Sequence, residues 1–209
     1  MTTYTINNAP GKASFLSQEE ITNRIGGLKE LKKDAAILQK RGLPFMMASV
    51  VIWTAITFLT IYKMDVMKMN FCIFCSSGLL MPLASLFGRI LGADIYRKST
   101  NPINKLGFLC NINQFLYLPI AMWAYSAHPE SMLLIYAIIF TAHLLPFSWV
   151  YDSKIYFTAS FVESLGVILV GYGFGYPIAI GFIVIMQIIV CIRLYMQVKE
   201  DEKEVESND

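Results

Sequence analysis

The stretch from Ile155 to Gly171 reads IYFTASFVESLGVILVG, an apolar run that contains a single charged residue, Glu163. Its length approaches the ~20 residues that a helix needs to cross the ~30 Å hydrocarbon core of a bilayer. A carboxylate at that depth costs on the order of 3 kcal/mol on insertion scales, so it needs a partner or a purpose. The stretch therefore predicts a membrane helix that turns an acid towards the protein interior.

The rest of the composition supports a membrane protein. Of the 209 residues, 56% are hydrophobic and 15% are charged, whereas a soluble domain carries about 25% charged residues. The charges gather in the first 42 residues, near the C-terminus and in two loops. This segregation indicates apolar spans between charged ends. The net charge of +2 gives no reason to expect a nucleic-acid partner.

Six apolar runs have spanning length, and together they predict an all-α, polytopic membrane protein with a six-helix transmembrane bundle over residues 43–198. The runs are residues 43–62, 71–92, 106–125, 131–150, 155–171 and 175–196. Pro82, Pro119 and Pro146 lie inside three of them and should kink those helices.

The basic residues predict the orientation. Lys and Arg gather before the first run, in the loops that contain Arg97 and Lys154, and after the last run, whereas Lys63 and Lys68 lie in the first outer loop. Because positive loops stay in the cytoplasm, we expect a multi-pass protein of the plasma membrane with both termini inside.

The two ends are expected to differ from the bundle. Residues 1–16 look disordered, and residues 199–209 form an acidic tail that is expected to be solvated and disordered. Residues 17–42 predict a cytoplasmic amphipathic helix, with a capping box at Ser17 and Glu20. Such a basic helix before a span favours a position along the inner leaflet; docking of a partner protein is the alternative.

A polar layer is expected at one depth of the bundle. Glu163 and His143 each lie ten positions from Ser153, on helices that a short loop should make adjacent and antiparallel. They should therefore share a level and form a pair. Other polar residues fall at this level: Asn111, Asn113, Gln114, Gln187, Ser49, Ser85, Ser160 and Ser164.

This layer has two interpretations. In the first it is an intramembrane site that transports or senses a proton, a cation or a small polar solute, with Glu163 binding and His143 relaying. Asn111, Gln114 and Gln187 complete that candidate site. In the second the layer holds helices together by hydrogen bonds. The protein is then a non-catalytic membrane interaction or structural protein whose N-terminal helix docks a partner.

Other chemical signals are weak. Cys72 and Cys75 have CxxC spacing at the outer start of a span, but no redox-protein context surrounds them. No catalytic motif, metal-ligand spacing or cofactor motif is present, so no catalytic residue, metal or cofactor is predicted and the interpretation leans against an enzyme. Ala84, Gly88 and Gly92 recur every four residues, which favours close helix packing; formation of a homo-oligomer is left open.

One segment resembles a known family. The run Asn111-Ile-Asn113-Gln114 comes before Tyr117, and Ala142-His143 comes before Trp149. With their neighbours in residues 105–156, these motifs resemble a family of small bacterial multi-pass proteins of unknown function. The resemblance implies a compact helical membrane protein, and it implies no activity and no site residue.

Overall fold

The chain folds into a helical bundle. The computed structural model describes residues 18–62, 64–93 and 100–208, and the predicted disordered segment 1–16 lies outside them. No strand occurs in these residues. The α-helices are α1 (Gln18–Leu38), α2 (Leu43–Ile61), α3 (Val66–Ser76), α4 (Leu80–Leu91), α5 (Pro102–Ala127), α6 (Pro129–Ala142), α7 (Leu145–Val150), α8 (Lys154–Phe174) and α9 (Tyr176–Asn208).

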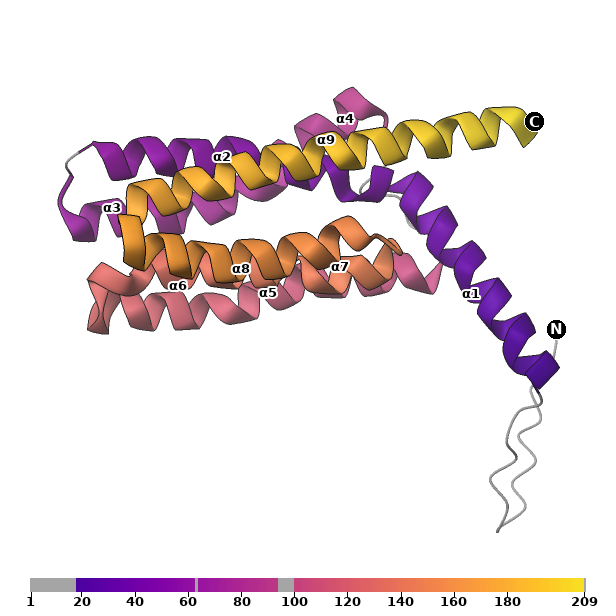
Figure 1. The fold of residues 1–209 in the computed structure, drawn as a ribbon, viewed down its shortest axis with the longest axis horizontal. Helices are drawn as coiled ribbons and strands as arrows, with labels where there is room; N and C mark the ends of the chain where they lie inside the picture. Colours follow the sequence, from indigo (N-terminus) through magenta and orange to yellow (C-terminus); the bar gives the residue numbers. More distant parts are fainter. Residues whose placement is uncertain (1–17, 63, 94–99, 209) are drawn as a thin grey trace, which may run out of the picture.

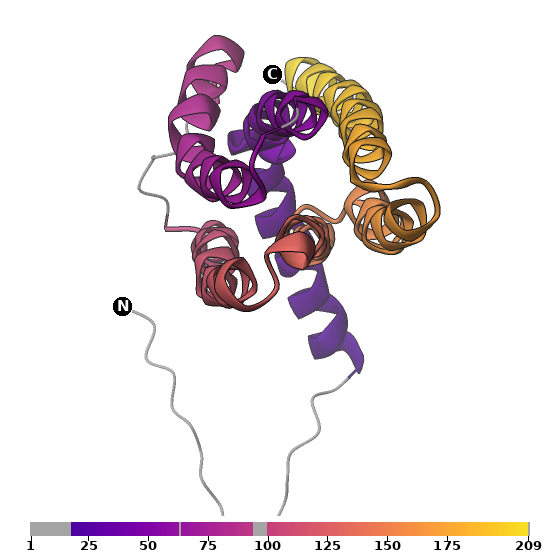
Figure 2. The same ribbon diagram turned by 90° about the vertical axis from the view of Figure 1, so that its left-hand side faces the viewer.

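The long helices run antiparallel along one axis (Figure 1). Seen end-on, they form a ring in the order α4, α2, α9, α8, α6 and α5 (Figure 2). Each helix in this order packs on the next. The ring is less tightly closed between its two ends, because α4 and α5 are not an extensively packed pair among the described residues. The starts of α2, α5 and α8 and the end of α9 meet at one end of the bundle. This end carries Lys40, Arg41 and Lys154, and we call it the basic end.

Five helical stretches of the described chain are long and apolar enough to cross a membrane: Lys40–Ile61, Val66–Leu91, Pro129–Val150, Lys154–Phe174 and Tyr176–Ser207. They match five of the six predicted spans. The predicted span 106–125 lies in α5, which has 26 residues and packs along α6. This helix is long enough, but its asparagine and glutamine residues make it less apolar, so length and hydropathy do not confirm a count of six.

The predicted breaks have clear local causes. A 3-10 turn at Ser77–Leu79 separates α3 from α4, and Pro82 follows in the first turn of α4. Helix α6 ends at Ala142, and Pro146 lies in the first turn of α7. Proline lacks an N–H group and clashes with the carbonyl four residues earlier, so the helical ladder is interrupted there. Pro119, by contrast, lies inside the continuous helix α5.

The acidic segment 199–208 differs from the expectation of a disordered tail, because α9 continues as a helix to Asn208. Its carboxylates meet basic partners: Asp201 pairs with Arg41, Glu202 with Lys40 at 2.7 Å, and Glu204 with Lys33 at 2.8 Å. Composition alone treated these charges as solvated. The fold brings the start of α2 beside the end of α9, which neutralises several of them.

Helix α1 projects obliquely from the basic end (Figure 1). Only its last turns pack closely, with Ala35 and Ala36 buried, while Ile25 is 49% exposed. The side-chain amide of Asn101 donates to the carbonyl of Leu31 at 2.7 Å, and the Lys32 ammonium lies 3.8 Å from the ring centroid of Trp149. A helix is thus present where the amphipathic helix is predicted, and these contacts attach its C-terminal half to the bundle.

Candidate functional site

The predicted site residues fall into two separate groups. In the first group, the Gln187 amide donates to Oε2 of Glu163 at 2.7 Å, and the Ser49 hydroxyl lies 2.6 Å from Oε1 of Gln187. The same hydroxyl lies 2.7 Å from the carbonyl oxygen of Met46. Glu163 and Gln187 have no exposed surface, so the acid does face the interior. This chain of contacts joins α8, α9 and α2.

His143 does not pair with Glu163. No hydrogen bond or ion pair joins the two residues, both of which the structure describes. Helix α6 ends at Ala142, and His143, just after this break, lines a hollow together with residues of α2 and α5, with its ring centroid 5.3 Å from that of Phe147. A hydrogen bond between α6 and α8 joins the hydroxyls of Thr141 and Ser164 instead, which are 2.9 Å apart.

The second group surrounds a hollow of about 40 Å³. His143 lines it from the break between α6 and α7, and Asn111 and Gln114 line it from α5. His143 is 7% exposed, and its Nε2 atom has no hydrogen-bond partner among the described residues. A buried polar atom without a partner is costly, so this nitrogen is placed to meet a water molecule or a ligand.

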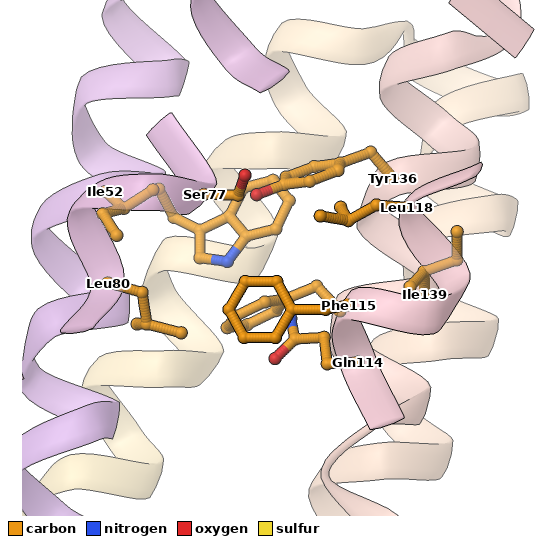
Figure 3. A pocket seen from close by; sticks show the side chains of 10 residues that line it. Ile52, Ser77, Leu80, Gln114, Phe115, Leu118, Tyr136 and Ile139 are labelled. Carbon is orange, nitrogen blue, oxygen red and sulfur yellow. The ribbon is translucent and has the colours of Figure 1, made fainter. Parts of the chain in front are cut away.

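A smaller hollow of about 20 Å³ lies beside the first, and Gln114, Leu80 and Phe140 line both. Figure 3 shows Gln114 and Phe115 on one side of this smaller hollow, opposite Leu80 and Ile52. Trp53 also lines it, and its indole Nε1 is buried without a partner in the described structure. We call these two neighbouring hollows the chamber.

The basic end closes the chamber with a tight turn. Gly42 lines the larger hollow beside Tyr151 and Tyr156. The backbone φ angles of Arg41 and Gly42 are 50° and 73°, in the left-handed region that glycine tolerates best. A Cβ atom on Gly42 would lie 3.0 Å from the Tyr156 hydroxyl and 3.1 Å from the Tyr151 ring. Only glycine fits this turn without displacing a tyrosine.

Side chains from three segments hold this turn. Arg41 donates to both carboxylate oxygens of Asp201, at 2.6 and 2.9 Å, and to the carbonyl of Tyr151 at 3.0 Å. The Tyr156 hydroxyl donates to the carbonyl of Arg41 at 2.7 Å, and the Tyr151 hydroxyl donates to Oε1 of Gln39 at 2.7 Å. We call Arg41, Tyr151, Tyr156 and Asp201 the latch. No sequence pattern indicates the latch, because its members are distant along the chain.

The remaining residues of the predicted layer have local partners. The Asn113 amide donates to the Tyr117 hydroxyl at 3.0 Å, one turn along α5. The hydroxyls of Ser85 and Ser160 donate to backbone carbonyls of their own helices at 2.7 and 2.9 Å. The layer is therefore not one continuous site: some members join helices, and three members line the chamber.

The chamber offers hydrogen bonds without a fixed charge. Its polar lining comprises an imidazole, two amides, a serine, tyrosines and the indole of Trp53. Since a water molecule needs a cavity of at least about 10–15 Å³, the larger hollow of about 40 Å³ has room for water or a small polar group. Within the described residues, no group of three His, Cys, Asp or Glu side chains is placed to hold a metal ion. Cys72 and Cys75 are free and exposed.

Comparison with known proteins identifies a family and no activity. A family model described as "Family of unknown function (DUF7010)" matches residues 28–197. No curated protein and no solved structure matches this chain. The resemblance seen in residues 105–156 to a family of unknown function is confirmed, and the match covers all of α2 to α8. The chain belongs to the DUF7010 family, a family of unknown function.

Proposed function

We propose that this membrane protein crosses the plasma membrane six times, with both termini in the cytoplasm. The support is the course of α5, which runs antiparallel to α6 over the length of the bundle (Figure 1). An even number of crossings also agrees with the basic residues that gather at both chain ends. In this arrangement α1 lies at the inner leaflet, where its exposed Ile25 and Leu31 meet lipid.

The chamber is proposed to bind a small polar solute or a proton, which the protein transports or senses. One observation carries this proposal: the Nε2 atom of His143 is buried, has no partner among the described residues, and belongs to a residue that lines a hollow. Imidazole gains or loses a proton near neutral pH and is both donor and acceptor when neutral. His143 is therefore the binding group, and Asn111 and Gln114 orient the solute.

Glu163 and Gln187 take a supporting role in this proposal. Their hydrogen bond and the adjoining Ser49 join three helices, and Met46, whose carbonyl oxygen lies beside the Ser49 hydroxyl, also lines the chamber. A change in the protonation of Glu163 would alter the acceptor that Gln187 meets and, through Ser49, the wall at Met46. Glu163 thus tunes the chamber rather than binding the solute.

A second candidate function is a non-catalytic interaction protein. The buried chain from Glu163 to Ser49 favours it, because these side chains hold helices together without an open site. The exposed apolar residues of α1, Ile25 and Leu31, would then dock a partner protein rather than lipid.

The experiment compares variants at the two histidines in purified protein. His143→Phe removes the chamber imidazole, and His128→Phe is the matched control because His128 is exposed in the turn between α5 and α6. Proton flux is followed with a pH-sensitive dye inside liposomes, and the flux of glycerol and urea is followed by light scattering. We expect wild-type flux of at least one probe, its loss in His143→Phe, and its retention in His128→Phe.

Binding without transport would appear differently. In that case no probe crosses the bilayer, but nitrogen NMR of His143 in the His128→Phe variant shows a ring nitrogen that titrates with pH or responds to a probe. An imidazole that neither titrates between pH 4 and 9 nor responds to any probe, together with no flux, would refute the chamber function.

A further inference from the structure

A groove on the outside of the bundle is separate from the chamber. It runs between α8 and α9 and has a volume of about 280 Å³. Its apolar lining includes Ile155 and Val162 from α8 and Met186 and Ile189 from α9. None of these four residues lines the chamber. Val162 and Ile189 are exposed, and α8 and α9 both belong to stretches that can span a membrane, so lipid would contact this groove in a bilayer.

Two cations lie at one end of the groove. Lys154 is the first residue of α8, and Arg193 lies on α9, and both line the groove. Both residues are exposed, and neither forms an ion pair with a described carboxylate. Other cations of the basic end, such as Lys40 and Arg41, are neutralised by the acidic end of α9. No ion pair of the described residues therefore occupies these two cations.

The start of α8 adds hydrogen-bond donors at the same place. Its N-cap residue, Ser153, makes no side-chain capping bond, because its hydroxyl donates instead to Oε1 of Gln197 at 3.3 Å. The first backbone N–H groups of a helix have no partner inside the helix, and the helix dipole places partial positive charge there. An anion bound between Lys154 and Arg193 meets these groups as well.

The depth of the cations matches the surface of a bilayer. Lys154 is the first residue of α8. The exposed ring of Trp149 is in the last turn of α7, shortly before Lys154 in the chain, and the exposed ring of Tyr195 is two positions after Arg193 on α9. Tryptophan and tyrosine favour the membrane interface. From this level the apolar residues of the groove extend along the outer surface of α8 and α9, towards the middle of each helix.

We propose that this groove binds a phospholipid with an anionic headgroup. The phosphate lies between Lys154 and Arg193 at the start of α8, and an acyl chain lies along Val162, Met186 and Ile189. Basic pockets between membrane helices recognise acidic headgroups by this combination of charge and apolar surface. A free phosphate ion leaves the apolar groove empty, and a zwitterionic lipid brings a cation close to Lys154 and Arg193.

The test uses the full-length protein in a neutral detergent. Binding of phosphatidylglycerol, phosphatidylcholine and inorganic phosphate is measured by native mass spectrometry and by the shift in thermal unfolding. We expect phosphatidylglycerol to bind at least fivefold more tightly than phosphatidylcholine. The double variant Lys154→Gln/Arg193→Gln should remove that preference, whereas Lys105→Gln/Lys203→Gln, which neutralises two exposed lysines outside the groove, should keep it.

A third variant keeps the charges and blocks the groove. Val162→Trp fills the apolar part and should weaken phosphatidylglycerol binding by a similar factor. Equal binding of the two lipids by the wild type would overturn the proposal, as would an unchanged preference in the Lys154→Gln/Arg193→Gln variant. A thermal shift with inorganic phosphate as large as that with phosphatidylglycerol would show an anion site only, and this also overturns the lipid assignment.

Discussion

Arg41 and Asp201 form a two-point ion pair although 160 positions separate them in the sequence: Nε and Nη2 of the guanidinium donate to the two carboxylate oxygens at 2.6 and 2.9 Å. The side chains are only 15% and 12% exposed. The pair connects the turn that closes the chamber to the end of α9. It therefore ties the geometry of the chamber to a segment that lies outside it.

Removing one partner of this pair should destabilise the protein. Asp201→Asn leaves a largely buried guanidinium without its carboxylate, and hydrogen bonds to charged groups contribute about 1.5–3 kcal/mol. We expect a loss of about 2 kcal/mol, measured by denaturant unfolding in detergent. In a double-mutant cycle with Arg41→Gln, the second substitution should cost much less once the first is present. Strictly additive losses would show that the two side chains act independently.

The turn at Gly42 should not tolerate a side chain. Gly42→Ala places a Cβ atom 3.0 Å from the Tyr156 hydroxyl on a residue with φ of 73°. We expect a loss of about 1–3 kcal/mol from the combined strain and crowding. Gly26→Ala is the control, because nothing lies within 4 Å of the added atom and the site is inside α1. That substitution should leave stability unchanged or raise it by about 0.5–1 kcal/mol. Similar unfolding midpoints for the two variants would contradict this interpretation of the turn.

The contacts of Glu163 predict different outcomes for two substitutions. Glu163→Gln keeps an oxygen that accepts from the Gln187 amide, so its stability should change by less than about 1 kcal/mol. Gln187→Leu removes the donor to Oε2 of Glu163, whose Oε1 already has no partner among the described residues, and should cost about 2–3 kcal/mol; the Ser49 hydroxyl keeps the Met46 carbonyl as its acceptor. Thermal unfolding of the purified variants measures both. A larger loss of stability in Glu163→Gln than in Gln187→Leu would show that the carboxyl group of Glu163, rather than its hydrogen bond with Gln187, stabilises the protein.

The six-crossing topology predicts opposite accessibility at the two ends of α5. Thr100 precedes this helix and Ser126 lies in its last turn, and both are exposed. In a chain whose native cysteines, Cys72, Cys75, Cys110 and Cys191, are replaced by serine, Thr100→Cys should react with a membrane-impermeant maleimide only from the cytoplasmic side. Ser126→Cys should react only from the outside. Reaction of both from one side would mean that α5 does not cross the membrane.

Sequence alone predicts most of the spanning helices, two of their breaks and the burial of Glu163. The runs that became α2, α6 with α7, α8 and α9 stand out because burial in lipid demands continuous apolar residues, which are visible along the chain. The breaks near Pro82 and Pro146 follow equally from backbone chemistry. Even the inward direction of Glu163 was predictable, because hydrocarbon does not accommodate a lone acid.

The tertiary structure decided which polar residues meet. Glu163 and His143 share a similar depth by counting along the helices, but His143, at the break after Ala142, lines a hollow with Asn111 and Gln114, while Gln187 donates to Glu163. The pairing of Arg41 with Asp201 was equally hidden, because helix rotation and the extension of α9 beyond the bundle set it. Sequence determines the depth of each group in the membrane, because burial in lipid depends on composition along one helix. Contacts between helices depend on how each helix is rotated about its own axis. Only the packing of the bundle sets that rotation.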